Sequence, residues 1–500
     1  MCHAAALTPF SPLPPLPGDD TLAAILDDAA ADAAAPFTAL AAAYFAEAGA
    51  GLGRVTSGRS PDELAARFDE PLPRAARPLA DVAARLARDV VADANRLTHP
   101  MSLGHQVAAP LPAAVWAEPV IAALNQSVAV QEMSPTGTPV ERQVIRWMSD
   151  LAGFGPRAGG TFTSGGTEAT FAALLAARSR ALPNVWTDGL GAVPPVIVCG
   201  DHAHYAVTRA AGEMGLGLRN VVQVPSRDAR GGDFRMNTAA LATKLADLAM
   251  SGRRVMAVVA TAGSTATGSF DDLTATADAC AAHDHWLHVD GAHGASALLS
   301  GTHRHRLRGL DRAHSLAWDP HKMLLLPLAA GVVLVRDERW LDGAFAQAAP
   351  YLFQDTPEAH AEEFDAGATG GGPPRGWDQG VRTFQCSRRA DALKLWVAFQ
   401  RYGADGLGAL YDRLCALAAR LYARLAAHPA FDVWHEPESN ILCFSRRASS
   451  FAGTAQPATS PAGGGWLDAA NAAVRAHYNA SGAGWITTTV LGGRGCCASR

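Results

Sequence analysis

The sequence predicts an α/β protein that has a mostly parallel sheet in a large domain and a smaller C-terminal domain. Between residues 105 and 345, short runs rich in β-branched residues alternate with helical stretches, which is typical of strand–helix–strand units. These runs are continuously apolar, as strands covered on both faces must be. A glycine-rich segment, Gly367–Gly376, then precedes a long helical pattern at Ala390–His428. We therefore expect the smaller domain to follow this segment.

Four segments are expected along the chain. Residues 1–19 include a proline-rich stretch and are expected to form a mobile tail. Residues 20–104 are alanine-rich and are expected to form a helical N-terminal lobe, broken at Gly51–Gly58 because glycine and proline interrupt helices. Residues 105–380 are expected to form the large domain and residues 381–500 the small one.

The large domain has five expected strands and at least two expected helices between them. The helices are expected at Glu168–Arg178 and Leu273–His283. The expected strands are Val196–Cys199, Val221–Val224, Val255–Ala260, Trp286–Val289 and Gly331–Val335.

Composition excludes several classes of protein. A hydrophobic content of 49% with 18% charged residues is typical of a globular protein that folds alone. The net charge of -5 gives no basic surface for nucleic acid or an anionic membrane. The longest apolar run, Met323–Val335, is shorter than the roughly 20 residues that span a bilayer. Eight cysteines without a Cys-x-x-Cys pair favour reduced thiols, and so a cytoplasmic location.

The segment Thr163–Ala169, Thr-Ser-Gly-Gly-Thr-Glu-Ala, opens an expected helix with two glycines and hydroxyl residues. Such a turn directs backbone N–H groups and the helix dipole towards an anion, normally a phosphate. The alternative is an ordinary helix start with a threonine cap.

Asp290 ends an apolar strand within the motif His288–His293. Ligands of open α/β sheets bind at the carboxyl ends of the strands, so this carboxylate can face a ligand. The alternative is an aspartate that caps a helix or a turn.

Lys322 lies in the motif Asp319–Met323, directly before the apolar run. A lysine in such surroundings can serve as an imine-forming amine. The alternative is a solvated loop lysine, which is less expected beside apolar sequence.

His204 lies in the motif Asp201–Tyr205, directly after an expected strand. A histidine there can stack on an aromatic ligand or act as a base, although a structural role is more common for a single histidine. No pair of histidines or cysteines has the spacing of a metal site, so no metal is expected.

In this order, the motifs resemble those of one known family. The sequence resembles the group II amino-acid decarboxylases that depend on pyridoxal 5'-phosphate (PLP), which include glutamate, aromatic L-amino-acid, cysteine sulfinate and diaminobutyrate decarboxylases. The resemblance extends from about His99 to Gly493. Besides the four motifs above, it is carried by Asn125–Ser127, Ser134–Pro135, Tyr351–Gln354 and Arg388–Trp396.

This resemblance implies the PLP-dependent transferase fold of type I, like that of aspartate aminotransferase. It also implies a homodimer in which both subunits contribute residues to each site. The expected reaction is decarboxylation of an L-amino acid to the amine and carbon dioxide. The alternatives are an aldehyde synthase, an aminotransferase-like activity, or a weakly active binding protein that keeps the PLP fold.

The resemblance also implies a role for each matching residue. Lys322 is expected to bind PLP as an aldimine, Asp290 to pair with the pyridinium nitrogen, and His204 to stack over the ring with Ala292 beneath it. His105 and Gln106 lie where relatives contact substrate. The remaining residues expected to hold the cofactor, around its phosphate, are Gly165, Gly166, Thr167, Thr265, Asp319 and His321.

The sequence departs from the family at three places. Asp319 stands where many relatives have asparagine, although diaminobutyrate-type members also have aspartate there. Relatives carry a loop tyrosine that protonates Cα, but no tyrosine lies between Tyr351 and Tyr402 here. With only His360 in the loop, or a residue from elsewhere, as the proton donor, we expect amine mixed with aldehyde or ketone. Relatives also continue after Gly493 into a strand and a helix. Because only seven residues follow here, we expect the small domain to lack a layer of packing.

Overall fold

The computed structural model describes Ile25 and residues 27–107, 109–229, 231–345, 376–451 and 465–499. The chain forms two compact units, of which one comprises Met1–Ser102 with Asn479–Gly484 and the other Leu103–Tyr478 with Trp485–Arg500. The predicted domain limits therefore stay predictions. The predicted tail, the motif Tyr351–Gln354, His360 and nearly all of the glycine-rich segment lie outside the described residues.

The first unit is helical, with three α-helices among its described residues: α2 (Ala35–Gly49), α3 (Pro61–Ala65) and α4 (Leu79–Asp89). The side chain of Ser60 accepts the N–H of Glu63, and the Glu63 carboxylate accepts the N–H of Ser60. This capping box satisfies two backbone donors at the start of α3.

The second unit contains a seven-stranded sheet with the order β1-β9-β8-β7-β6-β2-β3. Strands β8, β7, β6, β2 and β3 are parallel to one another, whereas β9 is antiparallel to both β8 and β1. The sheet is therefore mostly parallel, as predicted. Its strands are β1 (Gly159–Thr163), β2 (Val196–Gly200), β3 (Val221–Val224), β6 (Val255–Thr261), β7 (Trp286–Asp290), β8 (Ser315–Trp318) and β9 (Gly331–Val335).

All five expected strands are present, but β1 and β8 were not predicted. The sequences Gly-Gly-Thr-Phe-Thr and Ser-Leu-Ala-Trp lack a run of β-branched residues, so their local preference for a strand is weak. Pairing with β9 on both of its sides places them in the sheet.

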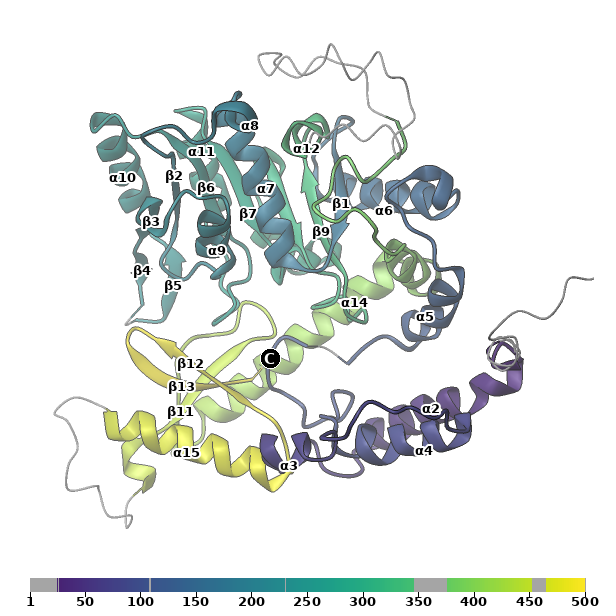
Figure 1. The fold of residues 1–500 in the computed structure, drawn as a ribbon. Helices are drawn as coiled ribbons and strands as arrows, with labels where there is room; N and C mark the ends of the chain where they lie inside the picture. The colour runs from purple at the N-terminus through teal and green to yellow at the C-terminus, as the bar shows by residue number, and fades with distance from the viewer. Residues whose placement is uncertain are drawn as a thin grey trace, which may run out of the picture. The chain divides into compact units, whose positions relative to one another are not determined.

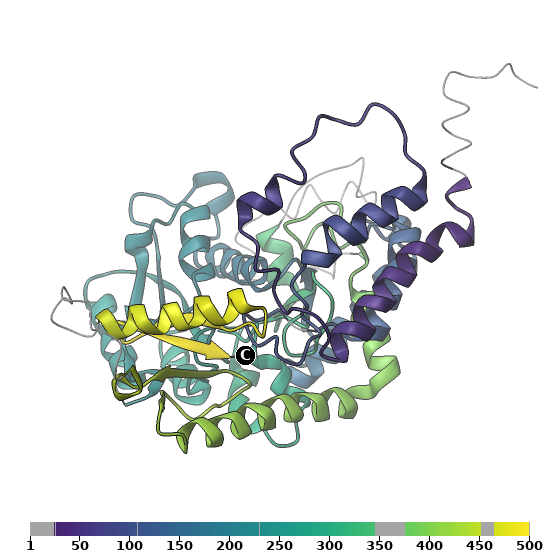
Figure 2. The same cartoon turned by 90° about the horizontal axis from the view of Figure 1, so that it is seen from below.

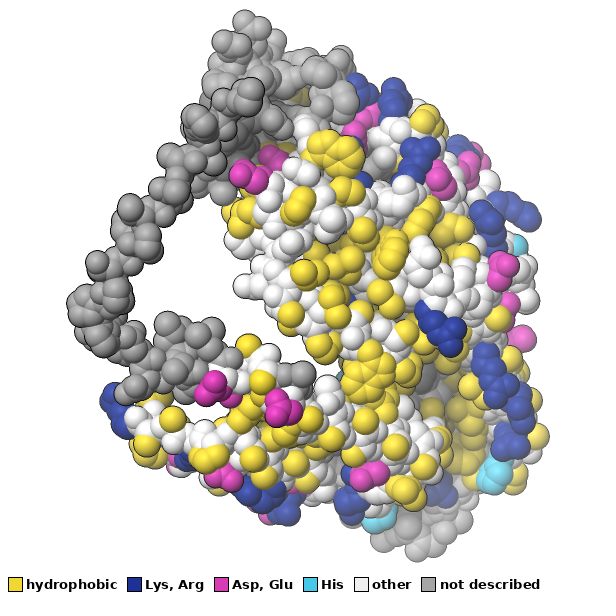
Figure 3. All heavy atoms as spheres, turned by 90° about the vertical axis from the view of Figure 1, so that its right-hand side faces the viewer, with side chains coloured by type: hydrophobic (Ala, Val, Ile, Leu, Met, Phe, Trp, Pro, Cys, Tyr) yellow, Lys and Arg dark blue, Asp and Glu magenta, His cyan; other side chains and the backbone are white. Residues whose placement is uncertain are grey.

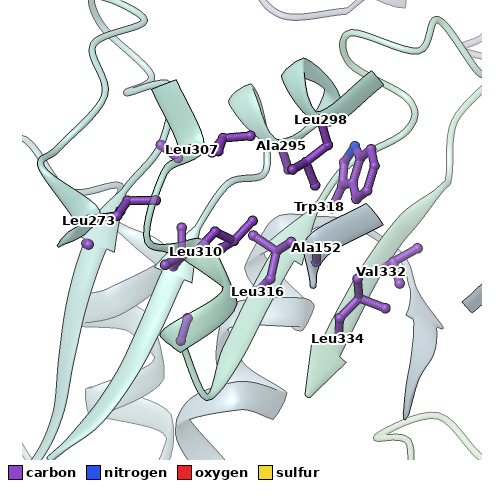
Figure 4. Close-up of a cluster of buried hydrophobic side chains, with 14 of the residues drawn as sticks. Ala152, Leu273, Ala295, Leu298, Leu307, Leu310, Leu316, Trp318, Val332 and Leu334 are labelled. Carbon is purple, nitrogen blue, oxygen red and sulfur yellow. The ribbon is translucent and has the colours of Figure 1, made fainter. Parts of the chain in front are cut away.

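Side chains of each strand alternate between two apolar cores, one on each face of the sheet. On one face, Leu316, Trp318, Val332 and Leu334 pack with side chains from α6, α10, α11 and α14, and Figure 4 shows part of this core. On the other face, side chains such as Ala317 and Val333 pack against α7 and α9, which lie across the sheet in Figure 1. Both faces are thus covered.

The helices of the second unit connect and cover these strands. Helix α14 spans the predicted long helical pattern but has a non-helical residue at Gly403. The α-helices are α5 (Pro112–Leu124), α6 (Gly137–Ala152), α7 (Gly166–Ala181), α8 (Val185–Asp188), α9 (Ala206–Glu213), α10 (Thr238–Met250), α11 (Leu273–Ala281), α12 (Arg339–Ala344), α14 (Ala392–Ala426) and α15 (Gly465–Ser481).

A second, antiparallel sheet lies in the C-terminal part, with the order β10-β11-β13-β12. Helices α14 and α15 lie along it (Figure 2). Its strands are β10 (Phe431–Val433), β11 (Leu442–Arg446), β12 (Thr487–Leu491) and β13 (Arg494–Ser499). A separate hairpin joins β4 (Ser226–Asp228) to β5 (Asp233–Met236).

Strand β13 corrects the expectation that a strand is missing after Gly493. Gly492 and Gly493 form the turn with positive φ, and Arg494–Ser499 pairs with β12 on one side and β11 on the other. Cys496, Cys497 and Ala498 are buried there. The expectation was wrong because the strand sequence Arg-Gly-Cys-Cys-Ala-Ser has no apolar alternation that a sequence pattern can detect.

No helix within the described residues is long and apolar enough to cross a bilayer. In the same part of the chain, no group of His, Cys, Asp and Glu side chains is arranged to hold a metal ion.

Candidate active site

A cavity of about 360 Å³ lies at the carboxyl ends of the parallel strands. Thr261 and Asp290 end β6 and β7, and Asp319 follows β8. Polar groups at these strand ends converge on one place, as expected for an open α/β sheet. The cavity is lined by Gln106, Ser164, Gly165, Gly166, Thr167, His204, Tyr205, Thr261, Gly263, Thr265, Asp290, Ala292, His293, Asp319, His321, Lys322 and Leu328.

The glycine turn after β1 forms one wall and leads into α7. A Cβ at Gly166 would lie 2.8 Å from Cβ of Ala292 and 2.9 Å from Oδ2 of Asp319. A Cβ at Gly331 would lie 2.4 Å from Cα of Gly165. Only glycine allows this approach, which directs the N-terminus of a sixteen-residue helix at the cavity. Such an N-terminus favours a phosphate.

Lys322 lies in a cluster of polar side chains with Asp319 and His321. Its Nζ is 3.1 Å from Oδ2 of Asp319, a carboxylate whose side chain is 2% exposed. Nε2 of His321 lies 3.5 Å from the same oxygen, while its Nδ1 accepts the N–H of Ala330. Burial lowers the pKa of His321, although Asp319 opposes this effect. The lowered pKa favours the neutral form of this imidazole beside Asp319.

Asp290 is held by the backbone at the end of β7. Its Oδ1 accepts the N–H of Ala292, and its carbonyl accepts the N–H of Ala262. Asp290 pairs in register with Thr261 of β6. The backbone of Asp290 is therefore fixed by β6 and β7, and its carboxylate by the turn that follows β7.

His204 faces the cavity from the turn after β2. Its Nδ1 accepts the N–H of Ala206, so the neutral ring carries its proton on Nε2. Burial lowers the pKa of His204, with Asp290 raising it and Lys322 lowering it. A neutral, planar imidazole with a fixed tautomer suits stacking on a flat ligand.

Thr265 lies on a stiff loop between β6 and α11. Gly263 has a φ of +83°, and a Cβ there would lie 2.7 Å from the N atom of Gly294. Within the loop, the hydroxyls of Ser264 and Thr267 lie 2.7 Å apart, and those of Thr267 and Ser269 lie 2.6 Å apart. These contacts hold the loop that carries Thr265.

The cavity also contains polar atoms that are ready for a ligand. Nε2 of Gln106, Oγ1 of Thr261 and Oδ1 of Asp319 are buried and have no hydrogen-bond partner among the described residues. Buried polar atoms are normally satisfied. With an amine, a strand-end carboxylate and an anion-binding turn around the same cavity, the donor set fits PLP.

The structure brings together every predicted site residue except His105. The ring of His105 lies 5.0 Å from that of Trp485, and His105 is not among the residues that line the cavity. Sequence reasoning missed six lining residues: Ser164, Tyr205, Thr261, Gly263, His293 and Leu328. Ser164, Tyr205 and His293 lie inside quoted motifs and Thr261 directly follows an expected strand, which is a usable signal. Gly263 and Leu328 gave no such signal.

The model of the pyridoxal-dependent decarboxylase conserved domain matches residues 61–447. The chain belongs to the pyridoxal-dependent decarboxylase family. Its cofactor is PLP and its reaction class is that of the carboxy-lyases, as the sequence predicted.

Individual relatives agree with this assignment. The chain is 32% identical over 362 residues to the acidic amino acid decarboxylase of Mus musculus, a match that spans 72% of this chain and 62% of the mouse protein. It is 33% identical over 444 residues to the L-2,4-diaminobutyrate decarboxylase of Rhizobium meliloti, spanning 85% of this chain and 78% of that protein. The crystal structure of mouse CSAD matches with a TM-score of 0.82 and 28% identity over 94% of each chain. The predicted type I fold is thereby confirmed.

The residues around the cavity fit the tasks that the cofactor requires. When bound, PLP supplies an electron-withdrawing ring that accepts the electron pair left by carbon dioxide. Lys322 would hold it covalently, and Asp290 would keep the proton on its ring nitrogen. The N-terminus of α7 would hold its phosphate.

Proposed function

We propose that this protein decarboxylates an L-amino acid to the amine and carbon dioxide. The observation that carries the proposal is that one cavity holds Lys322, Asp290 and the glycine turn at the start of α7. An amine for covalent binding, a carboxylate for the ring nitrogen and an anion site for the phosphate are the three groups that this chemistry needs.

We further propose that the substrate has a short side chain. Two relatives are named as an acidic amino acid decarboxylase and an L-2,4-diaminobutyrate decarboxylase. We therefore favour acidic and diamino compounds over large aromatic ones. Gln106 and Tyr205 supply polar groups for such a side chain.

The test is a panel of amino acids given to the PLP-loaded protein. Aspartate, glutamate, cysteine sulfinate, 2,4-diaminobutyrate, tyrosine and tryptophan are compared by release of carbon dioxide and by identification of the product. We expect amine and carbon dioxide from a short polar substrate. No carbon dioxide from any member would contradict the proposal. Amine mixed with some aldehyde or ketone is the outcome expected from the loop without tyrosine. A carbonyl product with oxygen uptake or ammonia, and no amine, would instead favour the alternative aldehyde synthase or aminotransferase-like activity.

We also propose that the protein is a homodimer. Trp116, Val120 and Leu124 lie at i, i+4 and i+8 on α5 and are 43%, 59% and 50% exposed. Figure 3 shows the side of the molecule on which α5 lies, with hydrophobic side chains gathered at the level of that helix. An exposed apolar stripe of this kind is typical of a protein interface.

Sedimentation of the purified protein tests this interface. We expect twice the chain mass of 52.0 kDa for the wild type and a shift to monomer for Val120→Asp. Met250→Asp is the matched control, because Met250 is an exposed apolar residue at the end of α10. A monomeric wild type would exclude the proposal.

We also propose a cytoplasmic location, because the cysteines are expected to be reduced. The cysteines of the described residues are all free thiols, a state that a reducing compartment maintains. Fractionation of cells that express the protein tests this location.

A further inference from the structure

His202 lies two residues before His204 but has no place in the mechanism described so far. It follows β2 and is not among the residues that line the cavity. Its side chain is only 9% exposed. A Cβ at Gly200 would lie 2.5 Å from Cε1 of this ring, so the imidazole is packed against the end of the strand.

Two carboxylates bracket the buried ring. Nδ1 of His202 lies 3.4 Å from Oδ1 of Asp201, and Nε2 lies 3.2 Å from Oδ1 of Asp271. The side chain of Asp271 is 1% exposed. A buried carboxylate without an opposite charge is strongly destabilised. A positively charged His202 supplies that charge to Asp271.

Asp271 in turn holds the end of β6. Its carboxylate accepts the N–H groups of Thr261 and Met236, and its own N–H donates to the carbonyl of Thr261. Thr261 pairs with Asp290 in the sheet, and both line the cavity. A continuous chain of contacts therefore leads from the turn that carries His204, through His202 and Asp271, to Asp290.

We propose that His202, bridging Asp201 and Asp271 as an imidazolium, is a positioning residue that fixes His204 relative to Thr261 and Asp290 around the cofactor. The inference rests on the proposed function, because His204 and Asp290 are placed there against the PLP ring. Loss of the bridging charge loosens two walls of the cavity without removing any group that touches the ligand.

The pKa of His202 agrees with a positively charged imidazole between the two carboxylates. Burial lowers the pKa of His202, but the hydrogen bonds and charges of Asp201 and Asp271 outweigh it and raise the pKa to about 9. Cys199 of β2 faces the same two carboxylates, and burial with their charges raises the pKa of its thiol to about 12. The thiol stays neutral, so His202 is the group of this cluster that loses its proton near pH 9. The stabilisation of the folded state by the charge of His202 is fully present below pH 6.5 and is lost as the pH rises through about 9.

The test compares PLP-loaded wild type with His202→Gln, whose amide can hydrogen-bond but carries no charge. The readouts are the visible circular dichroism of bound PLP from pH 7 to 10, and kcat and KM. We expect His202→Gln to bind PLP with a weaker dichroic band and about 10-fold lower kcat. We also expect it to lack the change that the wild type shows near pH 9. Changes that arise from the cofactor, Lys322 or the substrate amine persist in both proteins and cancel in the comparison.

Two further variants keep the proposal falsifiable. Asp201→Asn removes the more exposed carboxylate, 42% exposed, and should move the alkaline change to lower pH even if His202→Gln does not fold. His477→Gln, at an exposed position on α15, should change nothing. Wild-type dichroism and an unaltered alkaline change in His202→Gln, or no shift in Asp201→Asn, would overturn the proposal. Because dichroism needs no turnover, its outcome is separate from whether the protein decarboxylates any substrate.

Discussion

Nζ of Lys322 lies 3.1 Å from Oδ2 of Asp319, three residues earlier in the chain and almost wholly buried. The peptide N–H of Lys322 also donates to the carbonyl of Asp319. The backbone hydrogen bond closes a tight turn. The contact between Nζ and the carboxylate holds the amine of Lys322 at the cavity. The carboxylate also compensates the charge that the lysine brings into a partly buried site.

The first prediction concerns covalent binding at this lysine. Borohydride reduction of the PLP-loaded protein should fix the cofactor on the peptide that contains Lys322, and Lys322→Ala should abolish the label. The chain has only three lysines, at 244, 322 and 394, so mass spectrometry can assign the label directly. Lys244→Ala is the control that should keep it. Label on another lysine would contradict the assignment.

The second prediction concerns the carboxylate at the end of β7. Asp290→Ala removes the negative charge that would stabilise the protonated ring nitrogen. Loss of one such electrostatic partner costs about 100-fold or more in turnover. We expect a protein that still binds PLP but has kcat lowered by about that factor. Steady-state kinetics with the best substrate of the panel give the answer, and near-normal turnover would exclude this role for Asp290.

The third prediction concerns the glycine turn. In Gly166→Ala the new Cβ would meet Ala292 and Asp319 at under 3 Å, where the backbone must move away from the phosphate. We expect about 10-fold weaker PLP binding or more, since that shift removes at least one charge-assisted hydrogen bond. An absorbance titration measures the affinity. Gly212→Ala is the control, because a Cβ there meets no atom within 4 Å; equal affinity in the two variants would contradict the prediction.

The fourth prediction concerns the pH dependence of stability. His288 is fully buried in β7 with Nδ1 2.9 Å from Oγ of Ser315, and burial lowers its pKa to about 4. An unfolded histidine titrates at about 6.5. The unfolded state therefore binds more protons between these values, so this stability is present above pH 6.5 and is lost as the pH falls towards about 4.

The size of that effect can be measured with one variant. At about 1.4 kcal/mol per pKa unit, His288 accounts for about 3 kcal/mol of the acid loss. Urea unfolding of the wild type and His288→Asn between pH 7 and 4 should show their free energies of unfolding converging as the pH falls. A difference that stays constant over this range would show that His288 does not titrate in this way.

The fifth prediction concerns a buried ion pair beneath β1. Arg388 donates two hydrogen bonds to the Glu141 carboxylate, at 2.8 and 2.6 Å, and a third to Oγ1 of Thr161. Removing one partner of a buried pair leaves an uncompensated charge, so Glu141→Gln should lower the free energy of unfolding by about 3 to 5 kcal/mol. The exposed pair of Arg447 and Asp432 is the control, and Arg447→Ala should cost less than about 1 kcal/mol. Similar losses in both variants would contradict this ranking.

The sequence by itself determined the mostly parallel sheet, five of its strands and the family. These follow from local patterns: apolar runs of strand length, and motifs in which Gly165, Asp290 and Lys322 are each next to the residues that position them. It also identified eleven of the seventeen residues that line the cavity, because strand ends of a parallel sheet meet at one edge.

Only the tertiary structure decided what depends on residues far apart in the chain. Strands β1, β8 and β13 exist because neighbouring strands supply their hydrogen bonds, not because of their own sequence preference. His105 packs on Trp485 rather than into the cavity, while Leu328 enters it from the segment whose carbonyls Lys394 binds. The pKa of His202 is raised by Asp201 beside it and by Asp271, which lies nearly 70 residues away in sequence. A pattern of residue types records spacing along the chain, whereas these contacts arise only when packing brings distant side chains within hydrogen-bond distance.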